Sequence, residues 1–243
     1  MTQKSGTQFN CFSPPVMIAS LVIEMSLALY TIWRYKMSNL SRLVVLSLVA
    51  LATFQFCEYR VCTGYGLSAE QWSRLGYVAI TTLPPLGLHA LHIIAGKSQR
   101  KTVVISYATM VGFIGYFLTY SAAFIGYKCT GNYVIFQIGA GPAIAYGLYY
   151  YGWLFTAIVL GIKWARSTLK KAGETIRQNQ MTEALVIGYL VFLVPTAISN
   201  TVSPATRSGI PSIMCGFAVL YAVILTLYIL PRGGKLRRVS CKV

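Results

Sequence analysis

The chain of 243 residues is 56% hydrophobic and only 11% charged, with a formal net charge of +16 at pH 7. Soluble domains carry about 25% charged residues, so the composition excludes an ordinary soluble domain. The apolar residues form runs of roughly 20, the length that crosses about 30 Å of hydrocarbon, and they predict an all-α, polytopic membrane protein with seven transmembrane helices. In chain order, the predicted spans are Val16–Tyr35, Leu43–Val61, Leu75–Ala95, Val103–Phe124, Pro142–Ile162, Ala184–Val202 and Ile210–Leu230.

The basic residues are distributed unevenly between the two sides of these spans. If the N-terminus lies outside, the outer segments hold only Lys4, Arg60, Arg74, Lys128 and Arg207, and the other lysines and arginines fall in inner segments. Cytoplasmic segments of membrane proteins carry such an excess, so we predict an outer N-terminus and a cytoplasmic C-terminus. The positive charge then meets anionic membrane lipids, and no nucleic-acid partner is expected.

The connections predict a single seven-helix transmembrane domain, residues 1–243. Residues 1–14 form an outer N-terminal segment. Residues 125–141 form an outer loop in which YVIFQI is β-prone and lies between glycines, so a short hairpin or lid over the outer mouth is expected. Residues 163–183 form a basic cytoplasmic loop that is expected to prolong the fifth helix. Residues 231–243 form a basic cytoplasmic tail, which is expected to contact lipid or a partner protein.

Four titratable side chains fall inside the predicted spans, namely Glu24, Glu58, His89 and His92. Such groups cost several kcal/mol in hydrocarbon and are functional candidates. Glu24 lies near the middle of the first span, and His89 lies about 5 Å to the cytoplasmic side of the middle of the third, so these two side chains could pair. His92 follows one turn later on the same face as His89.

This layer has three interpretations. In the first, the side chains of Glu24 and the two histidines pair with one another and hold the first span against the third. In the second, they form a proton- or ligand-responsive switch, for which the ordinary titration range of histidine is suitable. In the third, His89, His92 and Glu24 supply three metal ligands and leave an open catalytic position. A His-x-x-His pair is a weak metal signal, and the chain contains no aspartate.

Polar side chains and prolines gather in the outer halves of four spans. Gln55 and Glu58 share one face of the second span, and the third, sixth and seventh spans bring prolines to a similar depth. Because irregular backbone is tolerated in lipid only where protein or water receives it, we predict an outward-facing polar cup under the outer loop. Pro84 and Pro85 are expected to break the third span and shape the floor of this cup. The candidate ligand contacts are Gln55, Glu58, Thr82, Asn200 and Tyr150.

The cysteines and the seventh span limit the chemistry further. Cys62 and Cys129 fall on the outer side, where a disulfide would tie the second span to the outer loop; the alternative is that they are free and buried as small apolar residues. The cofactor is unknown, but a retinal Schiff base is excluded in the seventh span, because IPSIMCGFAVLYAVILTLYIL contains no lysine. The metal set of seven-helix hydrolases such as alkaline ceramidases needs an aspartate, which is missing.

Four stretches appear in a distinctive order: WSRLGYVAITTLPPLGLH, GAGPAIAYGLYYYGWL, VIGYLVFLVPTAI and GIPSIMCGFAVLYAVIL. Their proline pair, Gly-Pro before tyrosines, central proline and late proline resemble the N-terminal seven-helix sensory region of membrane-bound histidine kinases from bacteria and archaea. The resemblance implies a ligand-responsive module in a prokaryotic plasma membrane. It does not extend to a kinase, so we expect signalling through a separate partner.

We therefore expect a stand-alone sensor or ligand-binding module rather than an enzyme, with Glu24, His89 and His92 coupling the cup to the inner side. Two alternatives stay open. One is a membrane enzyme or transporter that uses the same three residues for metal or proton chemistry. The other is a structural subunit of a larger membrane assembly, which a tightly packed outer half without a cavity would favour.

Overall fold

The computed structural model describes residues 14–98, 100–120, 123–129, 134–168, 175–202, 209–234 and 236. The helices are α1 (Pro14–Arg34), α2 (Asn39–Thr63), α3 (Ala69–Thr81), α4 (Leu83–Ile94), α5 (Arg100–Thr119), α6 (Ala140–Thr168), α7 (Thr175–Val202), α8 (Ile210–Val223), η3 (Ile224–Ile229) and α9 (Leu230–Gly233), and the strands are β1 (Phe124–Cys129) and β2 (Val134–Ile138). Within the described residues, seven helical segments are long and apolar enough to cross a membrane, as the sequence predicts. The third segment is α3 with α4, and the seventh is α8 with η3 and α9.

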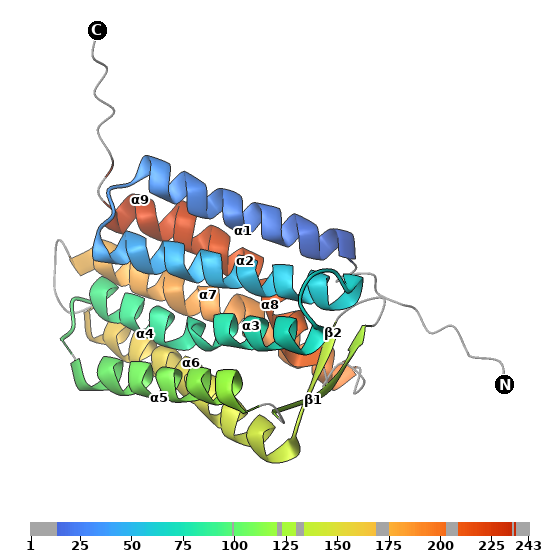
Figure 1. Ribbon diagram of the computed structural model, residues 1–243. Helices are drawn as coiled ribbons and strands as arrows, with labels where there is room; N and C mark the ends of the chain where they lie inside the picture. Colours follow the sequence, from blue (N-terminus) through green and yellow to red (C-terminus); the bar gives the residue numbers. More distant parts are fainter. Residues whose placement is uncertain are drawn as a thin grey trace, which may run out of the picture.

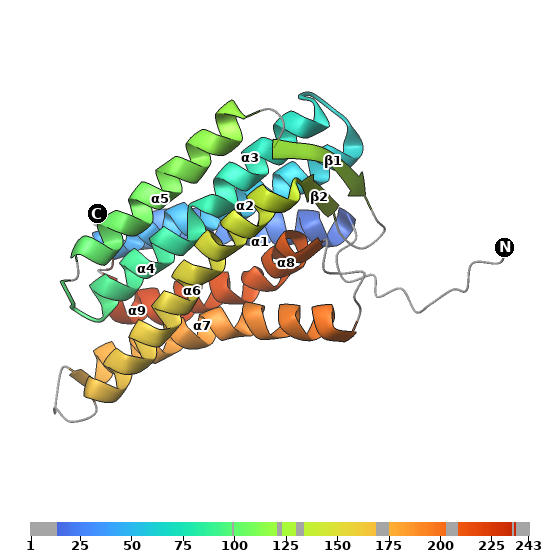
Figure 2. The ribbon, with the colours of Figure 1, turned by 90° about the horizontal axis from the view of Figure 1, so that it is seen from below.

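The helices run side by side as one bundle, with the hairpin of β1 and β2 at one end and α9 at the other (Figure 1). α2 is central, because it packs against α1, α3, α4 and α8. α5 lies along α3 and α4, while α6 and α7 run together along another side (Figure 2). Large apolar side chains such as Trp33, Leu148 and Val159 are exposed on the outside of the bundle. An exposed apolar surface of this kind is suited to contact with lipid.

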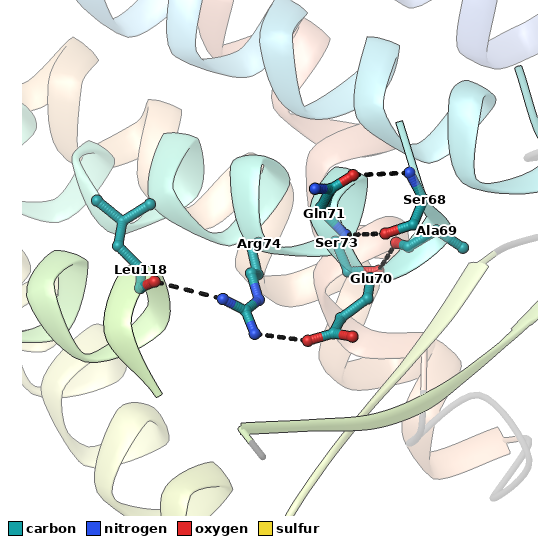
Figure 3. Close-up of polar contacts among 7 residues, drawn as sticks. All are labelled: Ser68, Ala69, Glu70, Gln71, Ser73, Arg74 and Leu118. Carbon is teal, nitrogen blue, oxygen red and sulfur yellow. Dashed lines mark hydrogen bonds and ion pairs between the residues drawn. The ribbon is translucent and has the colours of Figure 1, made fainter. Parts of the chain in front are cut away.

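Polar contacts define the start of α3 and join it to α5. Ser68 and Gln71 form a reciprocal capping box at the first turn of α3 (Figure 3), in which each side chain accepts a hydrogen bond from the backbone of the other. One turn later, Arg74 pairs with Glu70 and donates a hydrogen bond to the Leu118 carbonyl of α5, at 3.3 Å. The hairpin end of α3 is therefore tied to the end of α5.

β1 and β2 form an antiparallel hairpin in the segment where the sequence predicts a hairpin or lid. The fourth span ends at Thr119, earlier than predicted, and Phe124 begins β1 instead of ending a helix. A disulfide joins Cys62 at the end of α2 to Cys129 at the end of β1, which is the pairing considered from the sequence. The hairpin is thus covalently attached to the central helix of the bundle.

Much of the predicted cytoplasmic loop is helical. α6 continues to Thr168, beyond the predicted end of the fifth span at Ile162, and α7 begins at Thr175 rather than at Ala184. The predicted start was wrong because the first turns of α7 are polar, and an apolar run marks only the part of a helix that crosses hydrocarbon. Arginine, glutamine and methionine, which occupy these turns, are good helix formers.

The third span is interrupted at Thr82, between α3 and α4. Pro84 and Pro85 lack backbone donors, so the hydrogen-bond ladder is broken before them. Thr82 nevertheless keeps helical dihedral angles, φ −75° and ψ −23°, and the Leu86 amide donates to the Thr82 carbonyl at 3.2 Å. The chain direction continues through the interruption (Figure 1). Neither proline lines the cavity described below, so the prediction that they shape its floor was wrong.

Gly87 allows α4 and α7 to approach closely. A Cβ atom at this position would overlap the Tyr189 hydroxyl, and the Tyr189 side chain is buried. Because overpacking in a core costs about 1–3 kcal/mol, Gly87→Ala is expected to lower the Tm of the purified protein. Gly112→Ala in α5, where no atom lies within 4 Å of the new Cβ, is the control and should not lower the Tm. An unchanged Tm for Gly87→Ala would contradict the close approach.

Candidate ligand cavity

A cavity of about 690 Å³ lies between the hairpin, α3, α6 and α8. Pockets that hold small organic ligands typically measure about 300–1,000 Å³, so this volume suits one such molecule. The lining combines segments that are far apart in the sequence. It includes Tyr77 and Ile80 of α3, Lys128, Phe136 and Gln137 of the hairpin, Tyr146, Gly147, Tyr150 and Tyr151 of α6, and Pro211, Met214 and Cys215 of α8.

Aromatic rings build the wall of this cavity. Tyr77 is only 4% exposed, and its ring centroid lies 5.1 Å from that of Phe124, 5.6 Å from that of Phe136 and 5.4 Å from that of Tyr146. The Tyr146 hydroxyl also accepts a hydrogen bond from the Thr81 hydroxyl at 3.2 Å. One aromatic cluster therefore joins α3, the hairpin and α6, and it gives the cavity a largely apolar surface.

Polar groups reach the cavity from the hairpin and from α6. Lys128 and Gln137 come from opposite strands of the hairpin, and Tyr150 and Tyr151 bring phenol groups. The Tyr151 hydroxyl donates to the Met214 sulfur at 3.3 Å. No acidic side chain occurs among the described residues that line the cavity. The site is therefore suited to a largely apolar molecule that carries a hydrogen-bond acceptor or an anionic group.

Of the predicted ligand contacts, only Tyr150 lines the cavity. Gln55 and Glu58 are 2% and 1% exposed and lie within the packed part of α2. Thr82 donates its hydroxyl to a backbone carbonyl of α3 at 2.7 Å. Asn200 lies near the end of α7 and is not part of the lining. The structure thus does not gather these five residues around one cavity.

The predicted ligand contacts did not include Tyr77, Tyr146 or Tyr151, which line the cavity. In α6, Tyr146 and Tyr150 are four residues apart, as are Gly147 and Tyr151, so these four positions share one face of the helix. That spacing is visible in the sequence. Three consecutive tyrosines, however, point in three directions, and only the packing of α6 against α4 and α7 selects the face that meets the cavity.

Two buried carboxyl groups lie behind the cavity wall. Glu24 of α1 is 0% exposed and Glu58 of α2 is 1% exposed, and within the described part of the chain the Glu24 carboxyl group has no hydrogen-bond partner. The wall residues Tyr77 and Cys215 are both within electrostatic range of the Glu58 carboxyl, and Ser212 of α8 faces it. Glu58 therefore lies one layer behind the lining and does not form part of it.

The histidines lie elsewhere in the bundle. His89 Nδ1 is 3.2 Å from the Tyr107 hydroxyl of α5, and the His92 ring packs edge-on against Trp164 of α6. The predicted pairing of Glu24 with His89 is wrong, because α2 packs between α1 and α4 and places Glu24 near Glu58 instead. The residues that the structure describes contain no group of three metal-ligating side chains, so the suggested set of Glu24, His89 and His92 is not assembled.

Comparison with models of known protein families, with curated proteins and with solved structures finds no match. The similarity to histidine-kinase sensory regions therefore rests on the four sequence stretches and stays a prediction. Three of these stretches, in α3 with α4, in α6 and in α8, contribute residues to the cavity lining.

Proposed function

We propose that the protein is an integral membrane sensor that binds a small, largely apolar molecule in the cavity and signals through a separate partner. The hairpin end and the N-terminus would lie outside, because basic residues such as Arg34, Arg177 and Arg232 gather at the opposite end of the bundle, as expected for a cytoplasmic face. The observation that carries the proposal is the cavity of about 690 Å³. A purely structural subunit would be expected to pack this region with side chains.

α8, continued by η3 and α9, connects the cavity to the opposite end of the bundle. Met214 and Cys215 line both the cavity and a smaller void of about 20 Å³, which also contacts Tyr189 and Tyr221. Beyond α8, the chain continues into the π-helix η3, a type of turn that is frequent at functional sites. A ligand that displaces Met214 would move α8 against α7, and we propose that this movement carries the signal. Such a shift requires the ligand to bind one arrangement more tightly than the other.

Filling the cavity tests the proposal. Gly147 lines the cavity, and outside its own stretch of helix nothing lies within 4 Å of the position that its Cβ would occupy, so we expect Gly147→Leu to place a side chain in the cavity. Gly152→Leu is the matched control, because Gly152 also lies in α6 with open space beside it and does not line the cavity. Octanoate, octanol and octylamine serve as probes, since they share an apolar chain and differ in the charge of the head group.

Binding is measured as the rise in Tm of the protein in phosphatidylcholine nanodiscs, because a ligand that binds only the folded state stabilises it. We expect octanoate to raise the Tm more than octanol, and octylamine to have no effect, because Lys128 favours an anion. Gly147→Leu should abolish the rise, whereas Gly152→Leu should keep it. Equal shifts in both variants would indicate partition into lipid and would contradict the proposal.

The signalling part of the proposal needs a readout at the opposite end. Met37, just before α2, and Gln180 of α7 are both exposed there and can carry spin labels through introduced cysteines. Octanoate is expected to change the distance between the labels in the wild-type background and not in Gly147→Leu. If octanoate binds without any change in this distance, the protein binds a ligand but does not transmit a signal, and the sensor proposal is contradicted.

A further inference from the structure

A second cavity, of about 850 Å³, opens at the end of the bundle opposite the hairpin. It lies where α2 and α7 begin, where α4 ends and beside α9. We call it the basic cleft; its polar lining residues are Ser38, Asn39, Arg177, Gln178 and Arg232. The proposed ligand cavity shares no lining residue with this cleft.

Both arginines of the basic cleft donate hydrogen bonds to backbone carbonyls in the segment that contains η3 and α9. Arg177 Nη2 donates to the Pro231 carbonyl at 3.3 Å, and Arg232 Nη1 donates to the Tyr228 carbonyl at 3.1 Å. The Arg232 guanidinium also lies over the Tyr228 ring, 3.6 Å from its centroid. Because a guanidinium has five N–H donors, each arginine makes its backbone hydrogen bond and still has donors for a ligand.

Close packing holds α9, and with it Arg232, against the starts of α2 and α7. A Cβ atom at Gly233 would lie 2.8 Å from Leu40 Cδ2 and 3.1 Å from Met181 Sδ. Glycine therefore permits an approach that a larger residue would prevent. Arg232 immediately precedes Gly233, so this packing places Arg232 beside the start of α2.

The positive end of α2 faces the same cleft. Ser38 caps this helix by accepting a hydrogen bond from the Ser41 amide at 3.3 Å, whereas the amides of Asn39 and Leu40 lie in the first turn, where no intrahelical acceptor exists. Asn39 and Leu40 both line the cleft. The N-terminus of a helix of 25 residues adds a partial positive charge that favours an anion.

No carboxylate compensates this positive charge within the described part of the chain. The ion pair found there joins Arg74 to Glu70 at the hairpin end. Glu183, further along α7, accepts a hydrogen bond from Asn179 at 2.8 Å and does not line the cleft. Two guanidinium groups and a helix N-terminus therefore border one open cavity, and none of the described residues that line it is acidic.

We propose that the basic cleft is a binding site for a phosphate group, which Arg177 and Arg232 contact through their planar N–H donors and which the first amides of α2 complete. A phosphate in this position would connect α2, α7 and α9. The group can belong to a phospholipid headgroup or to free phosphate, and both supply the same oxygen acceptors.

The test uses the full-length protein in phosphatidylcholine nanodiscs. One arm titrates phosphatidic acid into the bilayer, and the other adds inorganic phosphate to the buffer; the readout is the Tm. Arg177→Gln and Arg232→Gln each remove one guanidinium, and Arg232→Lys keeps the charge but loses the planar donor pair. Arg42→Gln is the matched control, because Arg42 is exposed at the same end of the bundle and does not line the cleft.

We expect a saturable rise in Tm whose apparent affinity falls roughly tenfold in each of the two glutamine variants and changes less than about twofold in Arg42→Gln. A rise only with phosphatidic acid assigns the site to a lipid headgroup, and a rise with inorganic phosphate assigns it to free phosphate. No saturable rise, or equal losses in all three glutamine variants, overturns the proposal. If the glutamine variants do not fold in neutral nanodiscs, wild-type affinity for Arg232→Lys also overturns it.

Discussion

Replacing Tyr77 by alanine is expected to lower the free energy of unfolding by about 3–5 kcal/mol, the cost of truncating a large buried aromatic side chain. The Tyr77 ring contacts rings from α5, both strands of the hairpin and α6. Its loss therefore opens a void where four elements meet and enlarges the proposed ligand cavity. Chemical denaturation of the purified protein, followed by fluorescence, measures the change.

The control for Tyr77 is Tyr65→Ala in the connection between α2 and α3. The Tyr65 side chain is 71% exposed and contacts the Arg60 guanidinium, 4.6 Å from the ring centroid. An exposed contact of this type is worth less than about 1 kcal/mol, so the free energy of unfolding should change little. Equal losses for Tyr77→Ala and Tyr65→Ala would show that the aromatic cluster does not hold the hairpin end together.

Removing the disulfide with the double variant Cys62→Ala/Cys129→Ala is expected to cost about 2–4 kcal/mol, because the bond closes a long loop and restricts the unfolded chain. The two cysteines are separated by 67 residues. Their bond attaches the hairpin to α2, so the variant should also bind the octanoate probe more weakly, since Lys128 and Gln137 belong to the released hairpin. The Tm and the octanoate titration measure the two effects separately.

A reducing agent provides the matched experiment for this disulfide. It should lower the Tm of the wild-type protein toward that of the double variant and leave the double variant unchanged. Cys57 and Cys215 are free and buried, so Cys57→Ala should keep the sensitivity to reduction. A wild-type Tm that does not respond to the reducing agent would contradict a stabilising role for the bond.

The number and approximate position of the spans could be predicted because the thickness of hydrocarbon requires about 20 apolar residues per helix. The predicted ends failed where another force decides the structure. Residues after Thr119 leave the helix and enter a hairpin, and α7 starts in a polar segment at Thr175. Neither of these helix ends changes the hydrophobicity of the neighbouring apolar run, so the apolar pattern cannot show where the helix ends or starts.

The residues of the site were harder to predict because polarity does not indicate which neighbour a helix face meets. Gln55 and Glu58 share a polar face of α2, and that face is buried inside the bundle. Glu24 and His89 lie at similar estimated depths, but α2 packs between their helices. Depth along each helix follows from the sequence, whereas the order of the helices around the bundle does not.

The sequence alone therefore determined the largely helical fold, the seven long apolar segments and the β-prone hairpin, since each depends on the composition of one continuous segment. Only the tertiary structure decided that tyrosines of α3 and α6, rather than the amides and carboxyls of α2, line the cavity. It also decided that Arg177 and Arg232 meet the start of α2. Both outcomes depend on contacts between distant segments, where the rotation of each helix is set by the side chains packed against it.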